Sequence, residues 1–591
     1  MSRVGLVFAL GFLVAGPRTA RGEAIAWGEW SEASFARAQS EQRFVLLDLG
    51  AVWCHWCHVM EETTYKDPRV IELVRSRFLP VRVDQDARPD LSNRYEDYGW
   101  PATIVFDPRG PEIVKFSGYI PPDRMVSLLQ GIIDDPTPGP SVRFEAPPAS
   151  ATEAALTPAL RQDLEDLLVS RYDPEHGGWG FVKKFLDSDA VEYSLLRSRE
   201  GDKRAEQRAR QTLDAQLKLI DPVWGGVYQY SHGGNWENPH FEKIMAVQTE
   251  NLRIYAQAYL LWRDPAYLRA ARDIHRYLRG FLVSPEGGFY TSQDADPVPG
   301  EHGGEYFALS DADRRGRGIP RVDTHVYARE TAWAAHALVA LHAATGEPAP
   351  LQEAERAARF ILERRSLPGG GFRHDVVDAA GPYLGDTLSA GRAFLALYAA
   401  TGDRAWLGRA EEAAAFIDRS FRTEGAPGFV TARSASRFEP VHAQRDENIA
   451  LARFANLLSR YTGRGEHGQM AERALGFLTA PEVARRPQTG GVLLADGEMR
   501  AEPLHLTVVG GKDDPVSRAL LAAALAEPSA YKRVELWDRR DGPLPHADVA
   551  YPELQRAAAF LCTEGRCSAP AFTPEELRAR LERSATKRAA N

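Results

Sequence analysis

The stretch Trp53-Cys54-His55-Trp56-Cys57-His58 lies where an apolar run, residues 44–50, gives way to a segment, residues 59–65, that can continue as a helix. Cys54 is therefore predicted to lie near a helix N-terminus. There, unpaired backbone N–H groups and the positive end of the helix dipole stabilise a thiolate. Cys57 follows one helical turn later and can resolve a mixed disulfide by intramolecular attack. The stretch predicts a redox-active disulfide, Cys54–Cys57, with Cys54 as the attacking thiol.

Two residues outside this stretch fit the same fold. Asp48 lies on the predicted strand, where a buried carboxylate can exchange protons with the resolving thiol of Cys57. Pro101 follows Trp100 and precedes another apolar run, residues 103–107, which favours a cis-proline turn. A strand, a Cys-x-x-Cys helix and a later strand led by proline are typical of the thioredoxin fold. Asp48 and Pro101 are therefore predicted to belong to the catalytic site.

The two histidines admit two interpretations. His55 and His58, together with Cys54 and Cys57, are all zinc-ligand types. Structural zinc sites usually draw two ligands from a second, distant knuckle, and consecutive Cys-His pairs on one helical turn point in different directions. We therefore favour tuning of the cysteine thiolate by His55 and His58, with His55 in the catalytic site, because a nearby partly protonated imidazole lowers a cysteine pKa. No metal and no cofactor are expected.

The N-terminal residues predict export. Arg3 supplies a sparse positive charge, residues 4–15 form a short apolar core, and residues 20–22 fit a small-x-small cleavage site. The apolar core is too short to favour a membrane span, although an uncleaved anchor is the alternative. With residues 1–22 removed, the protein is expected to be periplasmic or secreted, to lack a stable membrane span, and to keep its disulfides.

Composition limits the remaining function classes. At 591 residues the chain is too long for one core, and 44% hydrophobic with 26% charged residues is ordinary for globular domains. The net charge is −9 and no block of lysine and arginine stands out, so nucleic acid is not an expected partner. Only four cysteines occur, which excludes a disulfide-built scaffold.

The chain divides by pattern into further parts. Residues 23–135 have the size of a thioredoxin-like domain, and residues 136–154, rich in proline, serine and alanine, are predicted to form a linker. Residues 155–500 carry amphipathic helical patterns separated by glycine-rich turns with an aromatic residue, as at 177–179 and 287–290. Such turns recur at roughly 50 to 80 residues. They predict an (α/α)6 toroid of the six-hairpin type, with an open helical array as the alternative.

The last part, residues 501–591, is predicted to be a small α/β segment, because strand-like and helix-like patterns alternate in it. Cys562 and Cys567 are separated by a loop that is long enough to close a disulfide, and export would preserve that bond. We favour a structural Cys562–Cys567 bridge over a second redox pair.

Several motifs together carry a resemblance to a known family. They are residues 53–60, 83–90, 99–101, 238–243, 293–296 and the tail around 562–570. On these motifs the sequence resembles the spermatogenesis-associated protein 20-like, thioredoxin-domain family, whose members join a thioredoxin-like domain to an (α/α)6 barrel similar to those of sugar epimerases and glycosidases. Residues 327–330, 385–387 and 444–448 depart from the family pattern. The resemblance therefore supports the architecture and the thiol motif more than carbohydrate chemistry.

A barrel site is expected where the loops of the inner helices meet. The candidates for substrate binding are Trp236, His240, Glu242, Lys243, Asp294 and Asp296. An epimerase needs a general acid and base, and a glycosidase needs paired carboxylates. If the barrel binds a sugar-like ligand, His240, Glu242, Asp294 and Asp296 must surround one mouth, with Trp236 or another aromatic residue on its wall. The alternative is a buried polar network that only fixes loops.

The sequence therefore favours an exported thiol–disulfide oxidoreductase that acts on protein thiols or disulfides, with the barrel as a platform for a substrate or partner. A carbohydrate-active barrel enzyme with a regulatory thioredoxin domain is the first alternative. A non-catalytic binding scaffold is the second.

Overall fold

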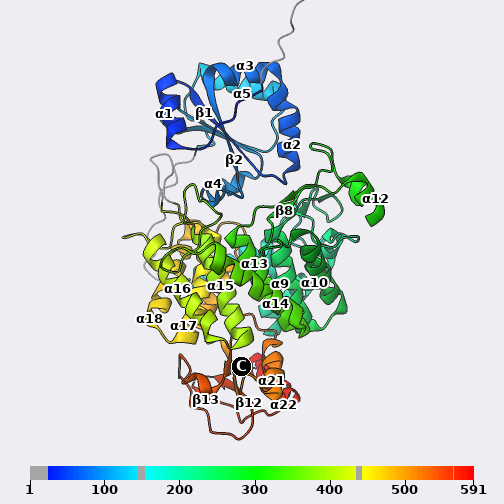
Figure 1. The fold of residues 1–591 in the computed structure, drawn as a ribbon, viewed down its shortest axis with the longest axis vertical. Coiled ribbons are helices and arrows are strands. Elements are labelled where there is room, and N and C mark those ends of the chain that lie inside the picture. Colours follow the sequence, from blue (N-terminus) through cyan, green and yellow to red (C-terminus); the bar gives the residue numbers. More distant parts are fainter. Residues whose placement is uncertain (1–23, 143–153, 434–441, 564, 591) are drawn as a thin grey trace, which may run out of the picture.

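The computed structural model describes residues 24–142, 154–433, 442–563 and 565–590. A thioredoxin-like domain lies at one end, a helical barrel in the middle and a small α/β domain at the other end (Figure 1). The predicted signal segment, residues 1–22, lies outside the described residues, as does most of the predicted linker. Within the described ranges, no helix has both the length and the apolar character needed to cross a membrane.

The N-terminal domain is built on a four-stranded sheet of order β2-β1-β3-β4. The central strand β1 (Phe44–Gly50) pairs in parallel with β2 (Phe78–Asp84) and antiparallel with β3 (Ala102–Phe106), which pairs with β4 (Glu112–Ser117). Alternate side chains of β1 enter two separate apolar clusters, one on each face of the sheet. The helices are α1 (Glu32–Glu41), α2 (His55–Glu62), α3 (Pro68–Arg77), α4 (Pro89–Arg94) and α5 (Pro122–Asp134).

The barrel is a closed ring of inner helices surrounded by outer helices. The inner helices are α7 (Ser188–Arg199), α9 (Met245–Trp262), α13 (Ala328–Thr345), α15 (Leu384–Thr401), α17 (Arg445–Thr462) and α20 (Gly490–Arg500). Each contacts the next, and α20 contacts α7 again. The outer helices are α6 (Pro158–Ser170), α8 (Lys203–Gln216), α10 (Pro265–Tyr277), α14 (Pro348–Arg364), α16 (Arg404–Phe421) and α18 (Gly465–Leu478). The toroid predicted from the sequence is confirmed, and closure excludes the open array.

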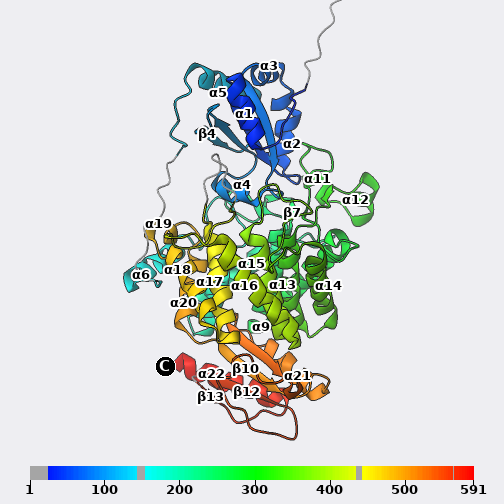
Figure 2. The ribbon, with the colours of Figure 1, turned by 60° about the vertical axis from the view of Figure 1, so that its left-hand side comes forward.

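The two ends of the barrel differ. Long loops lead into the inner helices at the end that faces the thioredoxin-like domain, and they pair there as short strands β7 (Lys243–Ile244), β8 (Ser292–Gln293) and β9 (Val322–Asp323). Short turns at the opposite end meet the C-terminal domain, where Gly402 lies against Leu536. Figure 2 shows the barrel held between the two α/β domains.

The C-terminal domain repeats the strand arrangement of the N-terminal one. Its order is β11-β10-β12-β13. The central β10 (Leu504–Val509) pairs in parallel with β11 (Lys532–Trp537) and antiparallel with β12 (Ala558–Thr563), which pairs with β13 (Arg566–Cys567). Helices α21 (Pro515–Leu525) and α22 (Pro574–Ala590) complete a β-α-β-β-β-α order. The predicted small α/β segment therefore has the strand topology of a second thioredoxin-like sheet.

This second sheet has no cysteine pair at the place equivalent to the N-terminal redox motif. Its first strand is followed by residues 510–514 and then by α21, whose N-cap is Asp514. Cys562 and Cys567 instead form a disulfide across the paired strands β12 and β13, with a sulfur–sulfur distance of 1.95 Å. The position favours a structural bridge.

Candidate redox site at the domain interface

The Cys54–Cys57 pair is a disulfide with a sulfur–sulfur distance of 2.12 Å. Cys54 is the N-cap of α2, and its sulfur accepts a hydrogen bond of 3.2 Å from the backbone N–H of Cys57. This is the position in which a helix N-terminus stabilises a thiolate. The peptide bond between Trp100 and Pro101 is cis, as the sequence predicted, and Trp100 packs against the cysteines.

The barrel covers the cysteine that was expected to attack. Cys54 is only 3% exposed, whereas Cys57 is half-buried. The apolar cluster around the disulfide includes Trp53 and Trp100 from the same domain and Ile244 from strand β7 at the barrel mouth. In this arrangement a folded protein substrate has little access to Cys54. The sequence did not indicate this cover, because Ile244 lies far from the motif along the chain.

Polar contacts hold α2 to the barrel beside the disulfide. Nδ1 of His55 lies 2.7 Å from one carboxylate oxygen of Asp296, and Nδ1 of His58 lies 3.1 Å from the other. Nε2 of His58 lies 3.1 Å from the carbonyl oxygen of Val52. Since both ring nitrogens of His58 face acceptors, the imidazolium is the form that satisfies them. Figure 1 shows α2 at the edge of its domain that faces β8.

The pKa values at this contact move in opposite directions. Burial disfavours the charged imidazole rings of His55 and His58, but the hydrogen bonds and charge of Asp296 outweigh burial and raise both pKa values. Burial also opposes ionisation of Asp296, yet the bonds from the two histidines lower its pKa. Each partner thus stabilises the charged form of the other.

Three of the predicted barrel residues converge on these histidines. Asp294 lies 3.6 Å from Nδ1 of His58, and burial raises its pKa to about 6. Burial raises the pKa of Glu242 to about 7, and the charge of His55 acts on it. Among the described residues, one carboxylate oxygen of Glu242 has no hydrogen-bond partner. Glu242, Asp294 and Asp296 therefore share one location, but the thioredoxin-like domain occupies it.

The other predicted barrel residues lie in packed surroundings. Lys243 donates to Asp221 at 2.7 Å and lies over the ring of Tyr277. The indole N–H of Trp236 donates to the carbonyl oxygen of His176, and its side chain is buried. Trp236 therefore does not form the expected wall beside the carboxylates. These two residues fit the alternative of a network that fixes loops.

His240 stacks on the ring of Tyr230, with ring centroids 4.1 Å apart. Burial, together with the nearby charges of other histidines including His55, lowers the pKa of His240 to about 4. The ring is therefore neutral near pH 7 and differs in charge from the two histidines of α2.

A second contact between the domains was not found from the sequence. The indole N–H of Trp53 donates to Asp86 at 2.7 Å, and Nε2 of His374 donates to the Asp86 carbonyl at 2.7 Å. The other nitrogen of His374 lies 2.9 Å from Asp386, whose charge raises the pKa of His374 to about 9 despite burial. Asp86 belongs to a motif that carried the family resemblance, but nothing in the sequence joined it to His374.

Asp48 is buried beneath the redox helix, as predicted. Its carboxylate accepts hydrogen bonds from Tyr65 at 3.0 Å and from Arg82 at 2.8 Å. Burial raises its pKa even though Arg82 acts in the opposite direction. A raised pKa suits a proton-exchange group, but the hydrogen bonds described for Asp48 do not include Cys57. Its role toward that thiol stays a prediction.

Three side chains at the interface lie close enough together to hold a metal ion. Ligand atoms of His58, Asp294 and Asp296 all lie within 4.8 Å of one another. These groups already satisfy each other in part through hydrogen bonds. The zinc interpretation that includes Cys54 and Cys57 requires thiolates, and here the two sulfurs are bonded to each other.

Comparisons with known proteins agree with this architecture. The family model described as Thioredox_DsbH, protein of unknown function, DUF255, matches residues 18–133. Spermatogenesis-associated protein 20 of Mus musculus is 27% identical over 307 residues, which cover 46% of this chain and 39% of the mouse protein. The match therefore spans about two-fifths of that relative's length. Thiol:disulfide interchange protein DsbD 2 of Pseudomonas aeruginosa is 38% identical over 80 residues, or 13% of this chain and 14% of that protein.

Among solved structures, a sugar epimerase from a ruminal bacterium aligns with 58% of this chain and 98% of its own, with a TM-score of 0.45 and 12% identity. The resemblance inferred from the sequence motifs is confirmed by the sequence matches. The chain is similar to spermatogenesis-associated protein 20 over 46% of its length, and its N-terminal domain matches the DsbH-like thioredoxin family model over residues 18–133.

Proposed function

We propose that this protein is an exported thiol–disulfide oxidoreductase whose Cys54–Cys57 pair works at the mouth of the barrel. The observation that carries the proposal is the Cys54–Cys57 disulfide at the N-terminus of α2, with Trp100 packed against it, within a thioredoxin-like sheet. Similarity of the N-terminal domain to a thiol:disulfide interchange protein supports the same chemistry. The N-terminal apolar segment supports export.

The reaction follows from thiol–disulfide exchange. A substrate thiolate attacks the sulfur of Cys54, forms a mixed disulfide and releases Cys57 as a thiolate. A second substrate thiolate then attacks the substrate sulfur of the mixed disulfide and releases Cys54. Two electrons pass from the substrate dithiol to the cysteine pair, and the substrate leaves as a disulfide. The reverse sequence reduces a substrate disulfide.

The barrel acts in this proposal as a cover that limits access to Cys54. Ile244 covers the disulfide, and the ion pairs of His55 and His58 with Asp296 hold that cover in place. A protein substrate therefore reaches Cys54 when the thioredoxin-like domain separates from the barrel mouth. Small thiols reach the half-buried Cys57 without that separation.

Trapping of the mixed disulfide tests the redox proposal. Cys57→Ser should accumulate a dithiothreitol-sensitive adduct with disulfide-bonded insulin, because the Cys54 thiolate attacks an insulin disulfide, releases one insulin thiolate, and no resolving thiol follows. The double variant Cys54→Ser/Cys57→Ser is the matched control and should form none. Titration of the wild-type pair against glutathione should give a defined midpoint. The proposal is wrong if no adduct forms and insulin reduction by the wild type equals that by the double variant.

A carbohydrate-active barrel is the second candidate, and one observation favours it. Asp294 and Glu242 lie at the mouth with pKa values raised to about 6 and 7, which suit general acid–base work near neutral pH. A sugar would have to displace the thioredoxin-like domain from these groups. A melting-temperature shift with a sugar that is lost in Glu242→Gln would support this candidate. A panel of sugars without any shift would remove it.

A further inference from the structure

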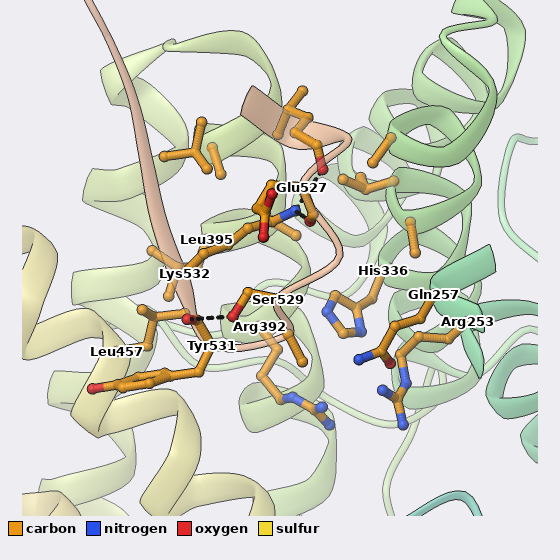
Figure 3. A pocket seen from close by; sticks show the side chains of 18 of the residues that line it. Arg253, Gln257, His336, Arg392, Leu395, Leu457, Glu527, Ser529, Tyr531 and Lys532 are labelled. Carbon is orange, nitrogen blue, oxygen red and sulfur yellow. Dashed lines mark hydrogen bonds between the residues drawn. The ribbon is translucent and has the colours of Figure 1, made fainter. Parts of the chain in front are cut away.

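The barrel holds a cavity of about 240 Å³ at the end away from the thioredoxin-like domain. Inner helices α7, α9, α13, α15, α17 and α20 form its wall, and a closing segment of the C-terminal domain, drawn from residues 525–534, lines part of its outer end. Figure 3 shows Ser529, Tyr531 and Lys532 from this closing segment opposite side chains of the inner helices. The volume lies slightly below the range of about 300–1,000 Å³ that is usual for ligand pockets, so a small molecule fits better than a peptide.

Five inner helices contribute a polar side chain at the same depth of this cavity. Each of the five is the ninth residue of its helix, counted from the first residue of α9, α13, α15, α17 or α20. They are Arg253, His336, Arg392, Arg453 and Glu498. A polar ring inside a helical toroid costs desolvation free energy, so its members need partners.

Two of the three arginines in the ring have carboxylate partners. Arg253 bonds to Glu192 and, at 2.7 Å, to Glu250. Arg453 bonds to Glu192 and, at 2.7 Å, to Glu498. These pairs satisfy both guanidinium groups in the way that buried charges require.

The third arginine, Arg392, has no hydrogen bond or ion pair with any described residue. Glu250 attracts it through space but bonds to Arg253, and burial lowers the pKa of Arg392. His336 and Gln257 also line the cavity without a hydrogen-bond partner in the described chain. Figure 3 shows the polar ends of Gln257, His336 and Arg392 gathered on one side of the pocket. Three polar groups from adjacent helices therefore face the cavity unpaired.

The rest of the wall is mainly apolar. Leu260, Val339, Ala396 and Leu457 line the same space from four inner helices or their last turns. Lys532 does not offer a second free cation, because its Nζ bonds to the carbonyl oxygens of Leu525 and Glu527. The cavity thus combines a single unpaired guanidinium with an aliphatic surface.

We propose that this cavity binds a small organic monocarboxylate with an aliphatic body, with the carboxylate on the guanidinium of Arg392. Arginine presents a planar pair of N–H donors that matches a carboxylate. Gln257 and His336 supply further polar contacts, and His336 does so as a neutral ring because burial lowers its pKa to about 3. A neutral polyol would leave the guanidinium of Arg392 without a hydrogen-bonded counter-charge, because Glu250 acts on it only through space. The site is independent of the thiol chemistry, since it lies at the other end of the barrel.

Calorimetric titration of the full-length protein with hexanoate, 1-hexanol and hexylamine tests the proposal. Hexanoate should bind at least about tenfold more tightly than 1-hexanol, because only the carboxylate pairs with Arg392. Arg392→Met should weaken hexanoate binding about 10- to 100-fold, and Arg392→Lys should restore part of it. Arg409→Met, on the exposed face of α16, is the matched control and should bind like the wild type.

Equal affinity for hexanoate and 1-hexanol, or an Arg392→Met variant that binds hexanoate like the wild type, would overturn the proposal. Absence of binding by the wild-type protein would also overturn it. If Arg392→Met does not fold, the comparison of hexanoate with 1-hexanol on the wild type still decides the point. Thiol exchange with insulin should not change in Arg392→Met, which separates this site from the redox pair.

Discussion

At the residue scale, Asp296 determines how the redox helix meets the barrel. Its two carboxylate oxygens bond to His55 and His58, which come from another domain, and it also accepts the backbone N–H of Gly300. A single carboxylate thus stabilises two imidazolium rings and one loop. Its removal would leave buried groups unsatisfied, which costs about 1–3 kcal/mol.

The contact predicts a pH dependence of stability. The folded-state pKa values of His55 and His58 are raised, so the stability they contribute is present below about pH 6.5 and is lost as the pH rises through the raised values. His374, with a pKa of about 9, extends the loss toward pH 9. The lowered pKa of Asp296 has the opposite effect, but only in acid. The melting temperature should therefore fall between pH 6 and pH 9.

Asp296→Asn isolates this effect, because it lowers the pKa values of both histidines of α2. The variant should lose about 1–3 kcal/mol at pH 6 and show a smaller decrease toward pH 9 than the wild type. Asp273→Asn, at an exposed ion pair with Arg276, is the control and should follow the wild-type profile. Identical profiles for the wild type and Asp296→Asn would show that these pairs contribute no net stability.

At the element scale, α2 and the β12–β13 hairpin carry the two disulfides in different settings. Cys54 caps a helix, whereas Cys562 and Cys567 face each other across paired strands. A helix N-terminus stabilises a thiolate and makes a disulfide easier to reduce reversibly. A bridge across two strands has no such group, so the two bonds should differ in chemistry.

For α2 we predict that reduced Cys54 is more acidic than a free thiol. The dependence of iodoacetamide alkylation on pH should give a pKa below about 8.5, the value of an unperturbed cysteine. Cys54→Ser should abolish insulin reduction and keep the circular dichroism of the wild type. A Cys54 that titrates at about 8.5 would argue against redox catalysis at this helix.

For the hairpin we predict a structural role. The double variant Cys562→Ser/Cys567→Ser should lose about 2 kcal/mol of stability, the loss expected for a loop this short. It should keep full thiol exchange with insulin, because neither cysteine lies at the start of a helix. Denaturant unfolding and the insulin assay measure both quantities. A loss of exchange in this variant would instead support a second redox pair.

At the scale of the whole molecule, the barrel is placed between two α/β domains with the same strand order. The N-terminal one covers the mouth, and its contacts there include the bonds to Asp296 and the bond of His374 to the Asp86 carbonyl. The C-terminal one closes the far end of the internal cavity. The barrel therefore offers a covered redox contact at one end and a cavity at the other.

Breaking the contacts of Asp296 and His374 at the mouth should expose the redox pair. Asp296→Asn/His374→Gln should increase the rate at which reduced Cys54 is alkylated, because the cover by Ile244 is held less firmly. The two substitutions should act cooperatively, since each alone leaves the other contact in place. His342→Gln, at the opposite end of α13, is the control. An unchanged alkylation rate in the double variant would show that the barrel does not limit access.

The sequence by itself determined the features that depend on local spacing. The thioredoxin-like fold followed from the apolar run before Cys54, the spacing to Cys57 and the position of Pro101. A strand, a helix start and a proline turn each depend on residues that are close together in the sequence. The recurring glycine-rich turns specified the helical hairpins in the same way.

Only the tertiary structure decided which residues of the different domains and helices contact one another. His55 and Asp296 are 241 residues apart, and no local pattern joins them. The sequence also cannot show that Arg392 is unpaired. Which arginine lacks a carboxylate partner is decided only when all inner helices are placed around one axis. Closure of the toroid and docking of the two α/β domains bring these residues together, and burial there changes their pKa values. Local spacing therefore determined the folds, and long-range packing determined the cover over the redox pair and the cavity behind it.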